Sequence, residues 1–328
     1  IAHLHGVLDS PPLREAYNAY EPKVVQYWTE LGHNEALFAK YKALRAGDEY
    51  PLLDAAQRRI VANELRDFRL SGAELPEDQK QRFAKISEEL ASLATRFSEN
   101  VLDATNAFAI RVEAREELAG IPDDVLQAAR AAAEREGKSG WKLTLQAPCY
   151  IPVVQYAENR VLRERLYHAF ATRASEQFGD ALAEAKRYSA RSDDAGQQPS
   201  NFDAADATAR ASDWDNTTLI TRILELRKEA AGLLGYASYA DVSLVPKMAE
   251  SPREVFAFLD DLAGKSLPFA QRDIAELREF AAAELGGADL SAWDIPFASE
   301  RLRTQRYAYS EQEVKQYFPE PKVLEGMF

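Results

Sequence analysis

The sequence predicts a mainly α-helical protein, and three observations lead to this prediction. Apolar residues recur at spacings of three and four through most of the 328 residues, as they do on one face of a helix. Glycine and proline are scarce, at 15 residues each, which disfavours turn-rich β-sandwiches. Residues that start and end helices flank the periodic segments. The length suits about two domains or one large helical body.

The first predicted helices lie in the N-terminal third. Ser10-Pro11-Pro12 is typical of a helix start, and an apolar face follows from Leu13 to Leu31. A second helix is expected from Leu53 to Leu70, before Gly72. The clearest helix follows Pro76. Its apolar residues step by three and four along one face: Phe83, Ile86, Leu90, Leu93, Phe97 and Val101.

The periodicity changes after an alanine-rich helix predicted for residues 122–136. Residues 141–145 alternate between apolar and polar, residues 150–154 do so less cleanly, and Pro148 lies between them. This pattern predicts one short β-hairpin near 141–154, the only β structure expected in the chain. A helix is expected to resume from Asn159 to about Ser175.

Residues 177–212 contain few large apolar side chains and a polar run, so they are predicted to form a flexible insertion. Asp215 or Asn216 is expected to cap the next helix. Ser251 to Glu254 forms a capping box, whose helix should end at Gly264. Two further helices are predicted, from Pro268 to Leu285 and after a second capping box at Ser310. The chain thus divides into an N-terminal helical segment, a hairpin with a helix, the insertion and a second helical segment: 1–140, 141–176, 177–212 and 213–328.

Charge and composition exclude several functions. Lys and Arg number 40 against 53 Asp and Glu, a net charge of −13 that disfavours nucleic acid as a partner. No basic amphipathic face and no apolar run of about 18 residues is present, so no membrane association is expected. No signal peptide pattern is visible, which predicts a cytoplasmic protein. The single cysteine, Cys149, excludes an internal disulfide and a cysteine-rich zinc site.

Motifs for catalysis are missing as well. The four histidines are His3, His5, His33 and His168, and none belongs to an H-E-x-x-H sequence. No G-x-S-x-G nucleophile elbow occurs. Neighbouring carboxylates are frequent, but adjacent residues of a helix point about 100° apart, so solvated helix faces are the simpler interpretation. A pair of carboxylates facing each other across a cleft, as in an unrelated hydrolase, has no positive support in the sequence. Several aromatic residues could pack in a core or touch a peptide, and packing is the stronger expectation.

Several strings match those of a known family in the same order along the chain: Arg66-Asp67-Phe68-Arg69-Leu70-Ser71-Gly72, Asn100-Val101-Leu102-Asp103-Ala104-Thr105, Leu143-Thr144-Leu145, Thr172-Arg173-Ala174-Ser175, Lys247-Met248-Ala249-Glu250, Trp293-Asp294-Ile295 and Tyr317-Phe318-Pro319. On these strings the chain resembles the non-catalytic N-terminal and middle part of the thimet oligopeptidase-like zinc oligopeptidases, the M3 family. The likeness extends from near Ser10 to Phe328. The predicted insertion at 177–212 departs from the family pattern.

The resemblance implies an elongated multi-helix lobe that forms part of the wall of a deep channel. In the family a zinc ion and a glutamate activate water to cleave short oligopeptides, which would be the partners of the whole protein. The family's His-Glu-Phe-Gly-His motif lies beyond the Tyr-Phe-Pro string, so no catalytic residue and no metal ligand is carried over. Zinc is expected in the full-length parent and not on this chain. The candidates for contact with substrate in the channel are Tyr150, Arg173, Trp293, Phe297 and Tyr307. A family string includes Trp293, Asp294 and Phe297. We expect their role to be structural.

Two functional hypotheses follow from the resemblance. In the first, the chain is the channel-wall portion of a zinc metalloendopeptidase, inactive by itself. This fits a sequence that lacks an initial Met and stops at an apolar Met327-Phe328 pair, as a fragment would. In the second, it is a complete, non-enzymatic helical protein of the same fold that binds peptides or another partner.

Overall fold

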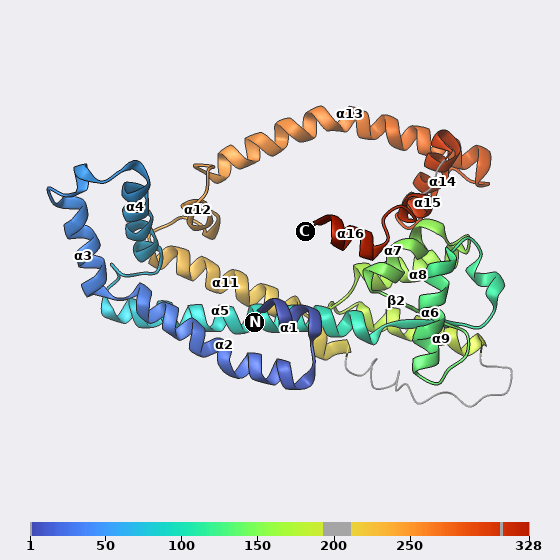
Figure 1. Ribbon diagram of the computed structural model, residues 1–328, viewed down its shortest axis with the longest axis horizontal. Helices are drawn as coiled ribbons and strands as arrows, with labels where there is room; N and C mark the ends of the chain where they lie inside the picture. The colour runs from blue at the N-terminus through green and yellow to red at the C-terminus, as the bar shows by residue number, and fades with distance from the viewer. Residues whose placement is uncertain (1, 193–210, 309–310, 328) are drawn as a thin grey trace. The chain divides into compact units, whose positions relative to one another are not determined.

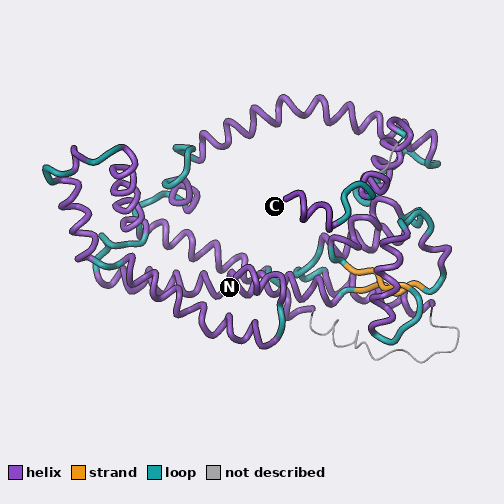
Figure 2. The backbone as a smooth tube through the Cα atoms, viewed as in Figure 1, coloured by secondary structure: helices purple, strands orange, loops and turns teal. Residues whose placement is uncertain are grey.

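The computed structural model describes residues 2–192, 211–308 and 311–327 (Figure 1). It is mainly α-helical, as predicted, and its described part contains one short two-stranded sheet (Figure 2). The chain forms two compact units. The first consists of Ile1–Ser98 and Thr218–Ala263, and the second of Glu99–Thr217 and Gly264–Phe328. Each unit therefore combines two stretches that are distant in sequence, a division different from the four consecutive segments expected.

The first unit is built from helices alone in its described residues. These are α1 (Ala2–Leu8), α2 (Pro11–Gly32), α3 (Glu35–Ala46), the 3-10 helix η1 (Tyr50–Leu52), α4 (Ala55–Leu70), α12 (Tyr239–Leu244), most of α5 (Glu77–Ala107) and of α11 (Thr217–Leu233), and the start of α13 (Pro252–Glu284). Local hydrogen bonds start several of them. The Asp54 carboxylate accepts from the Gln57 N–H at 2.8 Å, and the Gln57 side chain accepts from the Asp54 N–H at 3.0 Å. This reciprocal pair is the capping box that begins α4.

Two small cores hold the first unit together. Phe38 of α3 packs on Phe68 of α4, with ring centroids 5.3 Å apart. Ile86 of α5 is buried against Leu226 and Ala230 of α11. The helices α5 and α11 are also joined by two surface ion pairs, Arg82–Glu229 and Arg222–Glu89, each with a contact of 2.6 Å. Exposed pairs of this kind add little stability, so the apolar contact is the main constraint.

The second unit contains the sheet and the larger core. Its elements are β1 (Ala109–Val112), η2 (Arg115–Leu118), α6 (Asp123–Arg135), β2 (Trp141–Thr144), α7 (Ala147–Tyr156), α8 (Arg160–Ala171), α9 (Phe178–Ser192), η4 (Ala211–Trp214), α14 (Ile295–Tyr307), α15 (Glu311–Lys315) and α16 (Glu320–Met327). β1 and β2 are antiparallel, with Ile110 opposite Leu143. Both of these side chains are fully buried, together with Val153 of α7 and Phe178 of α9.

The predicted hairpin at 141–154 is wrong in its second strand. Residues 141–144 do form a strand, but its partner is 109–112, while Ala147–Tyr156 is a helix. Pro148 lies in the first turn of α7, where its missing N–H costs nothing, and the Gln146 carbonyl accepts from the Tyr150 N–H at 2.8 Å. Tyr150, Pro152, Val153 and Val154 are all buried. When nearly all residues of a short segment are apolar, the spacing of apolar residues cannot tell a buried helix from a strand.

The loop predicted for 177–212 is wrong over Phe178–Ser192, which is helix α9. Its buried side chains recur at spacings of four, three and three: Phe178, Leu182, Ala185 and Tyr188. Ala185 is small and Tyr188 carries a hydroxyl group. A count of large apolar residues therefore did not detect this buried helix face. Ala211 and Ser212, at the end of the predicted insertion, belong to the 3-10 helix η4, and residues 193–210 lie outside the described residues.

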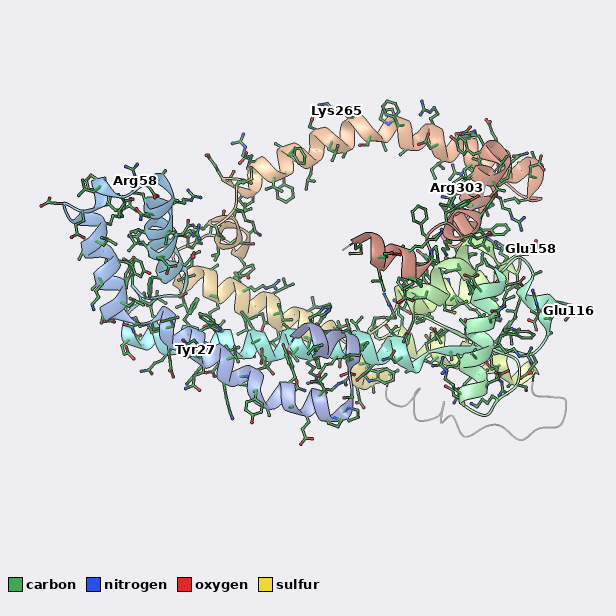
Figure 3. All side chains as sticks on the ribbon, in the orientation of Figure 1. Tyr27, Arg58, Glu116, Glu158, Lys265 and Arg303 are labelled. Atoms are coloured by element: carbon green, nitrogen blue, oxygen red, sulfur yellow. The ribbon has the colours of Figure 1, made fainter. Side chains whose placement is uncertain are left out.

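Helix α13 replaces the two helices predicted around Gly264 and Pro268. It is one helix of 33 residues that passes through both of them. Pro268 removes one helical N–H, which would have bonded to the carbonyl of Gly264. Residues 256–273 are all exposed, including Lys265 (Figure 3), so water can satisfy that carbonyl. Gly264 and Pro268, which often interrupt helices, therefore do not end this one.

A buried ion pair fixes α14 to α8 within the second unit. The Arg163 guanidinium donates to Asp294 at 2.8 Å, and Arg160 donates to the other carboxylate oxygen at 2.7 Å. The Ser291 N–H adds a third donor at 3.1 Å. The side chains of Arg163 and Asp294 are each only 5% exposed. A carboxylate removed from water to this extent is stable only when donors surround it, and here three do.

The pair shifts the pKa values of both partners. Burial acts to raise the pKa of Asp294, but the hydrogen bonds from Arg160, Arg163 and the Ser291 backbone outweigh it, and that pKa lies below its usual range. Burial lowers the pKa of Arg163, against the effect of Asp294. The Arg163 side chain also donates to the Ala157 carbonyl at 2.7 Å, at the end of α7. The Arg163 guanidinium thus links its own helix α8 to α14, through Asp294, and to the end of α7.

We expect Gly120→Ala to lower the free energy of unfolding by about 2 kcal/mol or more, from steric overlap and a left-handed backbone. Gly120 has φ +85°, and a Cβ there would lie 2.2 Å from the Tyr156 carbonyl oxygen. The matched control is Gly137→Ala, which has φ +70° but no atom within 4 Å of its Cβ. It should cost only about 1 kcal/mol. Equal losses in urea unfolding of the two variants would contradict this explanation.

We expect Asp294→Asn to destabilise the second unit by about 3 kcal/mol, because two guanidinium groups lose a buried counter-charge. Urea unfolding followed by tryptophan fluorescence reports on this unit, which holds Trp141, Trp214 and Trp293. The control Asp289→Asn removes an exposed carboxylate of the same segment and should change stability by less than about 0.5 kcal/mol. A loss of similar size in both variants would show that the buried pair has no special role.

The stability that Asp294 contributes should depend on pH in one direction. Its pKa is lower in the folded state than the value of about 3.9 in an unfolded chain, so the contribution is complete above that value. It is lost as the pH falls through the folded pKa. The difference in unfolding free energy between the wild type and Asp294→Asn should therefore be constant from about pH 6 to 8 and shrink towards pH 3. A difference that persists unchanged at pH 3 would show that the folded pKa is not depressed.

Candidate functional site

The five residues expected to contact substrate all belong to the second unit, where they form two groups and one isolated position. Tyr150 of α7 and Arg173, just beyond α8, meet at the ring of Phe170. The Tyr150 and Phe170 rings are stacked, with centroids 4.0 Å apart. The Arg173 guanidinium carbon lies 3.6 Å from the Phe170 centroid. At these distances the Tyr150 ring and the Arg173 guanidinium cannot occupy the same face of the Phe170 ring. They therefore lie on its two opposite faces.

Arg173 is a half-buried cation without a counter-charge in the described part of the chain. Its Nε–H donates to the Phe170 carbonyl at 2.8 Å, at the C-terminal end of α8, and Nη1 donates to Thr105 Oγ1 at 3.3 Å. No carboxylate of the described residues pairs with it. Burial lowers the pKa of Arg173, and the nearby Tyr150 acts in the opposite direction. Burial, together with Tyr167, raises the pKa of Tyr150, and Arg173 opposes this.

Trp293 and Phe297 flank the start of α14 and pack on arginines of α8. The Trp293 ring lies 5.1 Å from the His168 ring, and the Arg160 guanidinium carbon is 5.6 Å from Trp293. The Phe297 ring is contacted by Arg163 at 4.1 Å and by Arg301 at 5.1 Å. Arg301 in turn donates to Glu158, labelled in Figure 3, at 2.9 Å. These contacts give both aromatic residues a packing role in this unit.

Tyr307 stands apart from the other four. It lies at the end of α14, and 62% of its surface is exposed. The helix ends at Ala308, which adopts a left-handed conformation with φ +54°. The structure therefore groups Tyr150 with Arg173 and Trp293 with Phe297, and it leaves Tyr307 at the surface.

The sequence did not reveal two features of these surroundings. Phe170 was not singled out, although it organises the first group. The pairing of Arg160 and Arg163 with Asp294 was also missed, although Asp294 lies in a family string. Nothing in a single sequence indicates that residues 131 positions apart form an ion pair. The spacing of Arg160 and Arg163, one turn apart on a helix, is the only local signal.

The residues present do not fit a zinc site. A catalytic zinc takes three protein ligands, usually with a histidine pair on one helix face. Across the described ranges no group of three or more histidine, cysteine, aspartate or glutamate side chains could hold a metal ion. His33 bonds instead to the Ser71 carbonyl at 2.8 Å, and His168 packs beside Trp293. Burial raises the pKa of the Cys149 thiol, which suits a structural thiol and not a thiolate ligand.

Two other features bear on possible partners. In the first unit a pocket of about 340 Å³ is lined by α2, α4 and α5: Val24, Val25, Trp28, Thr29, Leu70, Ser71, Phe83 and Ser87. It carries no titratable side chain and so offers no acid, base or metal ligand. Among the described helices none is both long enough and apolar enough to traverse a bilayer.

Comparison with known proteins finds similarity to one peptidase family. Residues 201–328 match the model described as peptidase family M3, and residues 1–80 match that of the N-terminal domain of neurolysin and thimet oligopeptidase. Oligopeptidase A of Salmonella typhimurium and of Escherichia coli are each 40% identical to it over 328 residues. A probable cytosolic oligopeptidase A of Arabidopsis thaliana is 36% identical over 338 aligned residues.

These alignments cover the whole of this chain but only 43–44% of each relative, so it spans less than half of their length. The matched models lie near its two ends, and the alignments run through the residues between them. The resemblance expected from the ordered strings is thereby confirmed. By these matches the chain is similar to proteins of peptidase family M3.

Proposed function

We propose that this chain is the non-catalytic, substrate-channel part of a zinc-dependent M3 endopeptidase that acts on short peptides in the cytosol, and that it is inactive by itself. One observation carries the proposal. All 328 residues align with oligopeptidase A at 40% identity, yet they contain no H-E-x-x-H sequence and cover 44% of that protein. The zinc chemistry of the family, activation of water for attack on a peptide carbonyl, would then depend on residues outside this sequence.

Within this proposal the chain's own residues bind and orient the peptide. Arg173, which donates only to neutral acceptors in the described part of the chain, and Tyr307, which is 62% exposed, are the candidates for polar contact with the substrate, and the buried Tyr150 would support Arg173 through Phe170. Trp293 and Phe297 support this surface from the arginine-rich face of α8. We assign no proton transfer or covalent step to any of them.

The surface of α13 supports association with further polypeptide. Four large apolar side chains of the part of this helix that belongs to the first unit are between 49% and 66% exposed: Phe256, Phe258, Leu259 and Leu262. Apolar side chains gathered in this number on one helix usually mark an interaction surface. A free-standing peptide-binding protein would be expected to keep fewer of them in water.

We expect the purified chain to show no peptide hydrolysis with added zinc. A chimera in which it replaces the matched region of E. coli oligopeptidase A should cleave a short fluorogenic peptide in a zinc-dependent manner, within about tenfold of the parent kcat/KM. The control is the same parent with that region deleted. The proposal fails if the chain alone turns over peptide with zinc. It fails equally if a folded, zinc-loaded chimera binds peptide without cleaving it, which would favour the peptide-binding alternative.

A further inference from the structure

We propose that the pocket between α2, α4 and α5 is a binding site for a small, uncharged aromatic molecule that carries one hydrogen-bonding group. The pocket has a volume of about 340 Å³, within the usual range for small-molecule sites. All of its lining residues belong to the first unit, so the site does not depend on how the two units are placed. The proposal goes beyond the peptidase function and does not rest on it.

Short contacts between the three helices fix the walls of the pocket. α2 ends against Ser71, where a Cβ on Gly32 would lie 2.6 Å from the Ser71 Cβ. Beside this contact His33 bonds to the Ser71 carbonyl at 2.8 Å, and its ring lies 6.5 Å from that of Phe83. The Ser87 hydroxyl donates to the Phe83 carbonyl at 3.0 Å. Because these contacts hold the helices in place, little order has to be created when a ligand binds.

The pocket is apolar and open to solvent. Its apolar walls are formed by Val24, Val25, Trp28, Leu70 and Phe83, and none of its lining side chains carries a charge. Val24 and Trp28 are 54% and 62% exposed, so a molecule can reach these walls from water. Covering apolar surface that is otherwise in contact with water lowers the free energy. A ligand that fills the pocket is therefore stabilised by the hydrophobic effect.

The volume and the walls define the chemical class of this ligand. An apolar cavity of about 150 Å³ takes one benzene ring, so the larger pocket suits about two fused rings. The rings of Trp28 and Phe83 favour an aromatic ligand, because aromatic rings stack or pack edge to face. A charged ligand is disfavoured, since it would lose water without gaining a counter-charge.

Hydroxyl groups in the lining add a requirement for one polar group. Thr29, Ser71 and Ser87 each contribute a hydroxyl. That of Ser87 is used on the Phe83 carbonyl, whereas those of Thr29 and Ser71 make no hydrogen bond with other described residues. A single donor on an otherwise apolar ligand, such as an indole N–H, can therefore be paired in the pocket.

The test uses the full chain and four probes built on one ring system: indole, N-methylindole, indole-3-carboxylate and N-acetyltryptophanamide. Binding is followed by NMR through the methyl signals of Val24, Val25 and Leu70. We expect indole to shift these signals with a Kd of about 1 mM or tighter. N-methylindole, which lacks the donor, should bind severalfold more weakly. The carboxylate should bind at least about tenfold more weakly, because its charge must be desolvated. N-acetyltryptophanamide should also do so, because its two amides would be partly buried with too few partners.

Four variants assign the binding to this pocket. Val24→Phe and Val25→Phe each add a ring to the wall, and at least one of them should weaken indole binding about tenfold or more. The matched control is Val161→Phe, because Val161 is a 47% exposed valine of α8 outside the pocket, and it should leave the affinity unchanged. Thr29→Val or Ser71→Ala, which remove one hydroxyl each, should abolish the preference for indole over N-methylindole.

Methyl signals that indole does not move at a concentration of several millimolar would overturn the inference. So would undiminished indole binding in both folded filling variants, or equal binding of indole and its carboxylate. If N-acetyltryptophanamide binds as tightly as indole, the pocket accepts a polypeptide side chain and the assignment to a small molecule is wrong. If both filling variants fail to fold, the hydroxyl variants and the four wild-type titrations still decide the question. The chimera tests peptide cleavage and its outcome does not alter any of these.

Discussion

The buried carboxylate of Asp294 is the contact on which the second unit depends. It is held by Arg160, Arg163 and the Ser291 N–H, so the segment that begins α14 can dock on α8 in one register only. The same docking places Phe297 on the Arg163 guanidinium and Trp293 near Arg160. It also explains why Asp294, although it stands at the start of α14, makes no side-chain cap: its oxygens are already occupied by the arginines. A buried charge gives little net stability but strongly penalises any other arrangement.

Guanidinium groups stacked on aromatic rings recur around α8, and their charge balance differs. Arg163 lies on Phe297 and has a carboxylate partner, whereas Arg173 lies on Phe170 and has only neutral acceptors in the described part of the chain. The rings give each guanidinium a fixed plane at a low entropic cost. In the first case this rigidity serves packing. In the second it leaves a half-buried guanidinium with a fixed orientation and no carboxylate partner in the described part of the chain.

The similarity to peptidase family M3 and the absence of an H-E-x-x-H sequence from these 328 residues are compatible. The similarity to oligopeptidase A extends over the whole chain, but the described ranges contain no group of three or more histidine, cysteine, aspartate or glutamate side chains that could hold a metal ion. What remains is a scaffold of helices that positions aromatic and cationic groups. Such a scaffold can bind and orient a peptide without taking part in a chemical step, which is the role that the proposed function gives it.

The sequence by itself determined the fold class, the helices α4, α5 and α6 and the family resemblance, because these depend on local periodicity, capping residues and ordered strings. It could not decide between strand and helix at Ala147–Tyr156, where four apolar residues are buried on several sides. It also named Tyr150, Arg173, Trp293 and Phe297 without their partners. Only the tertiary structure decided that Ile110 pairs with Leu143, that Asp294 meets Arg163 and that Phe170 separates Tyr150 from Arg173. The reason is physical: these contacts join residues far apart in the chain, and packing, not local preference, selects them.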